Sequence, residues 1–215
     1  MPPADPTHRL LARLRDEIKR LEHRPARREG QVASGLASIE ALLPGGFPCG
    51  ALSELRGGPS SGKTAVALSA MAGLPGGALA AFVDGRGELY PPAAAALGVD
   101  LGRLLIVRPP GGEEGLRLAL WAAEALLGSG AFAVVAVDVP RGRPFRGAEV
   151  ALRRLVAAAE QGGAAGIWLS SPGAMLRPPA VVRLDLRSEH GRIAARRAEP
   201  AGMAGTARAG GVHAA

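Results

Sequence analysis

A phosphate-loop pattern is the feature of this 215-residue sequence that most constrains its fold. The stretch GGPSSGKT at Gly57–Thr64 matches G-x-x-x-x-G-K-[ST]. A strand-like apolar run precedes it at Ala51–Leu55, and a helix-like, alanine-rich run follows at Thr64–Ala72. In this context the backbone N–H groups at the positive end of the helix wrap a phosphate, whereas the alternative is a glycine turn without a ligand. The pattern predicts a phosphate-binding loop between a strand and a helix.

Each residue type in the loop has an expected role. The backbone around Pro59–Lys63 would wrap the β-phosphate, Lys63 would reach the β- and γ-phosphates, and the Thr64 hydroxyl would hold Mg²⁺. Lysine occurs only at Lys19 and Lys63, against 24 arginines, so a lysine retained here indicates a need for a compact ammonium. The expected nucleotide-binding residues of the loop are Gly57, Gly58, Pro59, Ser60, Ser61, Gly62, Lys63 and Thr64.

Strand-like and helix-like runs alternate after this loop, which is typical of an α/β fold with a parallel sheet and helices on both faces. We expect strands at Ala51–Leu55, Leu79–Asp84, Leu104–Arg108, Phe132–Asp138 and Gly166–Ser170. We expect helices at Thr64–Ala72, Pro92–Leu97, Glu114–Leu127 and Ala148–Gln161. Two further runs, Ala180–Arg187 and Arg192–Arg197, with a Ser-Glu-His-Gly turn between them, predict a closing antiparallel hairpin.

The two ends of the chain carry most of its formal charge of +7. Basic ends suit an acidic partner such as nucleic acid, and they equally suit a solvated surface. An apolar stripe in the N-terminal end predicts an amphipathic helix, packed on its own core or on a partner: Leu11, Leu14, Ile18 and Leu21. We expect this helix and a linker over residues 1–31, a nucleotide-binding domain over 32–198 and an unstructured tail over 199–215.

We infer the cellular compartment from features that the sequence lacks. The single cysteine, Cys49, has no second cysteine in the chain with which to form a disulfide, which fits a reducing compartment. No apolar run approaches the length of a membrane span, and the N-terminus lacks the pattern of a cleaved signal segment. We therefore expect a cytoplasmic protein.

Asp138 is a candidate partner of the phosphate loop. It ends the apolar run FAVVAVD, which would place a carboxylate at the carboxyl edge of the sheet, where it can hold the hydration shell of Mg²⁺. Many strands end in aspartate, so this assignment depends on the loop upstream. Together the two features predict an Mg²⁺ site formed by Thr64 and Asp138.

Residues 32–200 resemble the RecA family, with the matching segments in the same order along the chain. The segment VASGLASIEALLPGGFPCGALSELRGGPSSGKT is similar to the start of the family's core, with a Leu-Pro-Gly-Gly turn, a strand and the phosphate loop. The segment AFVDGRGELYPPAAAALGVDLGRLLIVRP is similar to the next strand, acidic turn, short helix and strand. The resemblance implies a RecA-like P-loop NTPase core that binds ATP and Mg²⁺, with Asp138 as the Walker B residue.

The sequence departs from the family's pattern around the expected nucleotide. Arg86 stands where the family has its catalytic glutamate, and a cation does not act as a general base. Glu88, two residues further on, is a candidate substitute, and Arg86 is a candidate clamp for the γ-phosphate. Tyr90 and Ala93 stand on the adenine side, where the family has a carboxylate and an aromatic residue. The sequence therefore does not indicate which nucleotide base the expected site would select.

The segments that resemble the family's DNA-binding loops are short. Ser171 replaces a glutamine at the end of one strand, and only PGAMLRPP follows it before the next. The loop after Asp138 offers three arginines, which would contact DNA phosphates or simply face solvent: Arg141, Arg143 and Arg146. Aromatic residues make up only 3% of the chain, so there is little to stack on bases. We expect weak DNA binding and no strand exchange by this chain alone.

This combination resembles the ImuA group of RecA-like and SulA-like proteins from bacterial DNA-damage operons. That resemblance implies an ATP-binding accessory role in the SOS response, translesion synthesis and induced mutagenesis, with weak or partner-dependent hydrolysis. The implied partners are an ImuB-like polymerase homologue, RecA itself, or a second copy bound through the N-terminal helix. Two alternatives stay open: an ATPase completed by assembly, with Arg196 or Arg197 reaching a neighbour's γ-phosphate, and a DNA-binding regulator with a vestigial nucleotide site.

Overall fold

The computed structural model describes residues 30–139, 143–189 and 191–198. Three of the expected features lie outside this part of the chain. They are the N-terminal stripe of Leu11, Leu14, Ile18 and Leu21, the expected tail over 199–215, and Arg141.

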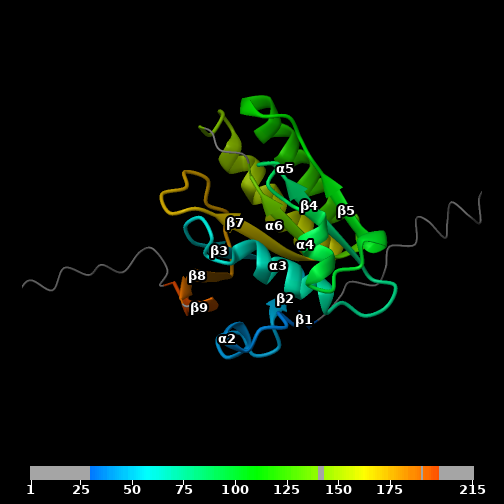
Figure 1. Cartoon of the computed structure of the whole chain (residues 1–215). Coiled ribbons are helices and arrows are strands. Elements are labelled where there is room, and N and C mark those ends of the chain that lie inside the picture. The colour runs from blue at the N-terminus through cyan, green and yellow to red at the C-terminus, as the bar shows by residue number, and fades with distance from the viewer. Residues whose placement is uncertain (1–29, 140–142, 190, 199–215) are drawn as a thin grey trace, which may run out of the picture.

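A seven-stranded sheet, in the order β5-β4-β6-β7-β3-β8-β9, forms the centre of the described structure (Figure 1). Its strands are β3 (Ala51–Arg56), β4 (Leu79–Asp84), β5 (Leu104–Val107), β6 (Phe132–Asp138), β7 (Ala165–Ser170), β8 (Val182–Glu189) and β9 (Arg192–Arg197). All neighbouring strands pair in parallel except β8 and β9, which are antiparallel. The expected α/β fold, its mostly parallel sheet and its C-terminal hairpin are confirmed.

In the β8–β9 hairpin, β8 ends later and the turn is shorter than the sequence predicts. Ser188 and Glu189 pair with Ile193 and Arg192, so they belong to β8 and not to the turn. The expected Ser-Glu-His-Gly turn is wrong at its first two residues, because the strand continues as long as its backbone groups find ladder partners. At its other end β8 runs parallel to β3, which makes the hairpin an extension of the main sheet.

Helices cover both faces of the sheet. The main helices are α3 (Lys63–Ala72), α4 (Pro91–Ala96), α5 (Gly112–Gly128) and α6 (Ala148–Gly162), and their ends lie within two residues of those expected. Short elements complete the described chain: β1 (Gln31–Val32), α2 (Ala37–Glu40), β2 (Phe47–Pro48) and the 3₁₀ helix η1 (Leu101–Arg103). None of the described helices has the length and hydropathy of a membrane-spanning segment.

Two hydrophobic clusters hold these layers together, one on each face of the sheet. Alternate residues along β4 divide between them, since Phe82 packs with α3 while Ala81 and Val83 pack with α5 and α6. This period of two is what a strand covered on both faces requires. Burial on both sides fixes the register of the sheet, and so fixes which side chains reach its carboxyl edge.

Candidate functional site

The phosphate-loop pattern lies where the sequence places it, between the end of β3 and the first residue of α3. Gly62 caps α3 in the left-handed conformation, with a φ of 90°, and Ser60 also has a positive φ of 58°. These reversals fold the loop over the start of the helix, whose first N–H groups have no partners within the helix. The loop thereby forms a backbone cradle suited to an anion.

Lys63 is held against this loop by hydrogen bonds to neutral groups. Its Nζ donates to the carbonyl oxygens of Gly57 at 2.7 Å and Gly58 at 2.8 Å, and to Ser61 Oγ at 3.2 Å. The residue is only 9% exposed, and burial lowers the pKa of its ammonium while the carboxylate of Asp138 acts in the opposite direction. The ammonium is therefore fixed in place without a carboxylate bonded to it.

The β8–β9 hairpin supports the loop from outside, a contact that the sequence pattern did not reveal. A Cβ added at Gly57 would lie 2.6 Å from the backbone oxygen of Leu186 on β8 and 2.4 Å from Ser61 Oγ. A Cβ at Gly62 would lie 2.7 Å from the side chain of Ile193 on β9. The glycine at position 57 is needed because a rigid backbone oxygen occupies the space of a side chain.

A pocket of about 390 Å³, here called the loop pocket, opens above the phosphate loop. It is lined by residues 59–65 together with Arg86, Glu88 and Asp138. The structure thus brings the expected residues Lys63, Thr64 and Asp138 to one pocket. A threonine hydroxyl and a carboxylate are oxygen donors of the kind that Mg²⁺ prefers, so these side chains fit the expected ion.

Asp138 ends β6 as expected and faces the same edge as Asp84, its register partner on β4. Asp138 is 7% exposed, and burial raises its pKa to about 6. Arg86 is the largest influence that lowers this pKa, while Glu88 and Asp84 raise it and Lys63 lowers it. The carboxylate of Asp138 is therefore costly to ionise and depends on nearby cations.

Asp84 organises the turn that follows β4. Its carboxylate accepts hydrogen bonds from the backbone N–H groups of Glu88 and Leu89, and it forms an ion pair of 2.9 Å with Arg108 Nε. The Asp84 side chain is fully buried. Sequence reasoning did not assign this role, although Asp84 ends the run LAAFVD just as Asp138 ends FAVVAVD.

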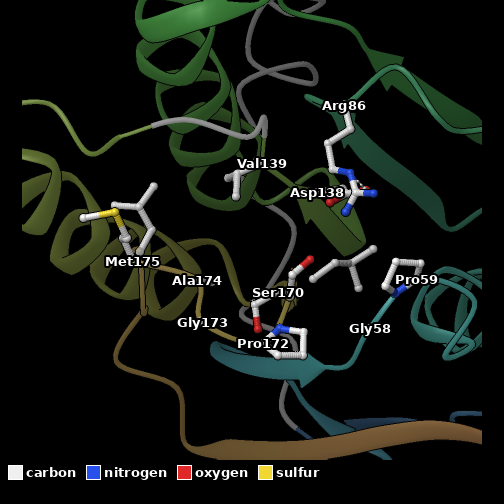
Figure 2. A pocket seen from close by; sticks show the side chains of 13 residues that line it. Gly58, Pro59, Arg86, Asp138, Val139, Ser170, Pro172, Gly173, Ala174 and Met175 are labelled. Carbon is white, nitrogen blue, oxygen red and sulfur yellow. Dashed lines mark ion pairs between the residues drawn. The ribbon is translucent and has the colours of Figure 1, made fainter.

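Arg86 and Glu88 project from this turn beside the loop. The Arg86 guanidinium forms an ion pair with Glu88, and its Nε lies 3.8 Å from Asp138 Oδ2. Figure 2 shows the Arg86 side chain directed toward Asp138. The Arg86 side chain is 14% exposed, and its Nε is buried without a hydrogen-bond partner. Arg86 is thus at the pocket, as expected of a clamp, but in this structure its ionic partners are carboxylates.

A second pocket of about 430 Å³, here called the β7 pocket, adjoins the loop pocket (Figure 2). It lies between the phosphate loop and the segment that follows β7, and Pro59, Arg86 and Asp138 line both pockets. Ser171 and Met175 also line it. The short segment between β7 and β8 therefore forms a wall of the pocket beside the phosphate loop.

The structure does not bring the other predicted residues into the loop pocket. Tyr90 precedes α4, is 67% exposed and does not line that pocket. Arg143 and Arg146 are exposed on the connection between β6 and α6. Arg196 is exposed on β9 and forms an ion pair of 2.9 Å with Asp185. The roles expected for these residues stay predictions.

Comparison with known proteins agrees with this architecture. The family model described as RecA N-terminal domain matches residues 15–142. The chain is 42% identical over 123 residues to "Protein RecA" of Staphylococcus carnosus, covering 56% of this chain and 34% of that protein. It is 43% identical over 109 residues to "Protein RecA" of Lactobacillus delbrueckii subsp. bulgaricus, covering 50% of this chain and 32% of that protein. The chain thus spans about a third of the length of these relatives. Because the family model matches more than half of the chain, the chain belongs to the RecA N-terminal domain family.

Proposed function

We propose that this chain is an ATP-binding accessory protein of the bacterial DNA-damage response, of the ImuA group. It supports translesion synthesis and induced mutagenesis through protein contacts in the cytoplasm. ATP binds in the loop pocket with its phosphates on residues 57–64. Thr64 and Asp138 hold Mg²⁺, which supplies positive charge across the β- and γ-phosphate oxygens.

One observation carries this proposal: Arg86 lies at the pocket, paired with Asp138, where related proteins are expected to have a catalytic glutamate. A guanidinium stays protonated at every physiological pH, so it neither accepts a proton from water nor aligns water as a carboxylate does. The loop, with Lys63 fixed by three hydrogen bonds, retains what binding requires. The site therefore favours binding over rapid hydrolysis.

The surface around the pocket supports an accessory role rather than strand exchange. The connection between β7 and β8 runs only from Ser171 to Val181, and part of it forms the wall of the β7 pocket. Arg143 and Arg146 are exposed and suit weak contacts with DNA phosphates. We propose an ImuB-like polymerase homologue or RecA as the partner, with the N-terminal stripe as the contacting segment.

The test is to measure ATP binding and turnover by the full chain and by Lys63→Ala, each with and without single-stranded DNA and the two candidate partners. We expect tight binding by the wild type, slow turnover in every mixture, and co-purification with one partner. Lys63→Ala should weaken ATP binding about 100-fold, because it removes a buried charge-assisted contact to the phosphates. Fast DNA-stimulated turnover would contradict the accessory role, and absence of ATP binding would contradict the site itself.

A second function, a partner-stimulated ATPase, is favoured by Glu88. Its carboxylate lines the loop pocket, and 57% of its side chain is exposed, so it is accessible to water there. Under this alternative a partner separates Glu88 from Arg86 and leaves the carboxylate to align water. Glu88→Gln would then abolish the stimulated turnover while ATP binding persists, whereas the accessory role expects no stimulated turnover to lose.

A further inference from the structure

Arg86 holds a position that ATP binding alone does not explain. Its side chain projects from the turn after β4 and lines both the loop pocket and the β7 pocket. There it contacts the carboxylate of Asp138, as Figure 2 shows, and it also forms an ion pair with Glu88. A permanent positive charge therefore lies beside the carboxylate expected to hold Mg²⁺.

The contacts of the two cations show where their charges act. Arg86 lies against two carboxylates, since its guanidinium forms an ion pair with Glu88 and its Nε lies 3.8 Å from Asp138 Oδ2. Lys63 is held instead by the backbone of the loop, through Gly57 and Gly58. Arg86 thus already balances the acidic edge of the sheet, which is part of what a bound divalent cation would do.

The geometry of Arg86 also leaves hydrogen-bonding capacity for a ligand. Its Nε is buried, makes no hydrogen bond, and lies 3.8 Å from Asp138 Oδ2, which is beyond hydrogen-bonding distance. A guanidinium presents several N–H donors in a planar fork that matches two oxygens of a phosphate. Arg86 lines the loop pocket together with residues 59–65, so phosphates held on the loop would lie in the pocket that this guanidinium faces.

We infer that Arg86 is a built-in cation that replaces part of the charge neutralisation supplied by Mg²⁺, so that this chain binds ATP nearly as well without Mg²⁺ as with it. The inference rests on the proposed function, because it requires ATP in the loop pocket. Arg86 reduces the dependence of ATP binding on Mg²⁺ in two ways. The guanidinium pairs with phosphate oxygens, and its attraction for Asp138 opposes the binding of a hydrated Mg²⁺ at that carboxylate.

The test is to titrate a fluorescent ATP analogue into the full chain, once with excess Mg²⁺ and once with EDTA. We expect the two dissociation constants of the wild type to agree within about threefold. For Arg86→Gln we expect binding about tenfold weaker in EDTA and restored by Mg²⁺, because the added metal then supplies the positive charge that Arg86 supplied. Arg86→Lys keeps the charge but loses the planar fork of N–H donors. The ratio of its dissociation constant in EDTA to that with Mg²⁺ should therefore lie between the ratios of the wild type and Arg86→Gln.

The matched control is Arg154→Gln. It removes the same charge from a surface pair with Glu124, between α6 and α5, and should keep the wild-type ratio. A wild type that loses more than about tenfold of its affinity in EDTA, or an Arg86→Gln variant with the wild-type ratio, would overturn the inference and leave ATP binding intact. The comparison of EDTA with Mg²⁺ in the wild type does not depend on whether any variant folds. If the wild type binds no nucleotide under either condition, the proposed function fails together with the inference.

Discussion

Lys63 and Arg86 are two cations of the same pocket that the protein holds in opposite ways. Lys63 is bonded to carbonyl and hydroxyl oxygens, so its charge is oriented by dipoles and not cancelled. Arg86 is paired with the carboxylates of Glu88 and Asp138, so its charge is largely balanced. The first arrangement attracts an anion, whereas the second stabilises an acidic edge.

The difference separates the two halves of the site by function. The half formed by β3, the loop and α3 has the features that we propose to bind phosphate, while the half formed by the ends of β4 and β6 carries a cation in the expected place of a base. A change on the first half should therefore act on the loop and on affinity. A change on the second half should act on charge balance, on its pH dependence and on the need for Mg²⁺.

The largest effect is expected from Gly57→Ala, which removes the space that the loop needs in order to hold Lys63. A Cβ at this position would lie 2.6 Å from the backbone oxygen of Leu186, and a strand backbone does not move aside as a side chain does. Overpacking of this kind costs about 1–3 kcal/mol, so the free energy of unfolding in urea should fall by that amount.

The neighbouring glycine provides the control for this change. A Cβ at Gly58 would meet no atom within 4 Å, and Gly58 does not have a positive φ. Gly58→Ala should therefore change the free energy of unfolding by less than about 1 kcal/mol. Equal losses in both variants would show that the hairpin does not brace the loop.

The two halves also differ in how far the sequence predicts them. Gly57–Thr64 is one continuous pattern with a strand before it and a helix after it, so its position follows from local spacing alone. Asp138 follows from the end of an apolar strand, because parallel strands bring their carboxyl ends to one edge. The seven strands and four main helices are predicted within two residues for the same reason: their periodicity is local.

What the sequence does not predict depends on contacts between distant segments. Leu186 lies 129 residues beyond Gly57, and no spacing near either residue indicates that a strand backbone closes over the loop. The ion pair between Asp84 and Arg108 likewise joins the last residue of β4 to the residue that follows β5. The carboxylate partners of Arg86 depend on side-chain orientation within a turn. Such contacts are set by tertiary packing, which a periodic pattern does not encode.

An effect of similar size, specific to the second half, is expected for the pH dependence of stability. In the folded chain without nucleotide and Mg²⁺, the pKa of Asp138 is raised from 3.8 to about 6, so between these values the folded state binds more protons than the unfolded state. Its contribution therefore lowers the free energy of unfolding as the pH rises through this window. Asp138→Asn removes the titration, and at neutral pH it should be more stable than the wild type by about 3 kcal/mol.

This difference should vanish below about pH 3, where the carboxyl group is neutral in both the folded and unfolded wild type. Urea unfolding of both proteins across the window measures it directly, and the wild-type minus variant difference cancels the other titrating groups. A variant less stable than the wild type at neutral pH would mean that Arg86 and Lys63 outweigh the burial of the Asp138 carboxylate. The second half would then resemble a tight ion-pair network rather than a costly acidic edge.

The smallest effect is expected from Arg108→Gln, which asks whether the turn that carries Arg86 depends on a cation behind it. Arg108 is 50% exposed, while its partner Asp84 is fully buried and keeps its hydrogen bonds from the backbone of Glu88 and Leu89. Solvent screens the arginine side of the pair, so the free energy of unfolding should fall by only about 1 kcal/mol. The exposed pair of Arg154 with Glu124 gives the baseline, since Arg154→Gln should cost less than about 0.5 kcal/mol. If both variants give the same loss, backbone hydrogen bonds alone hold Asp84, and the turn presents Arg86 without help from Arg108.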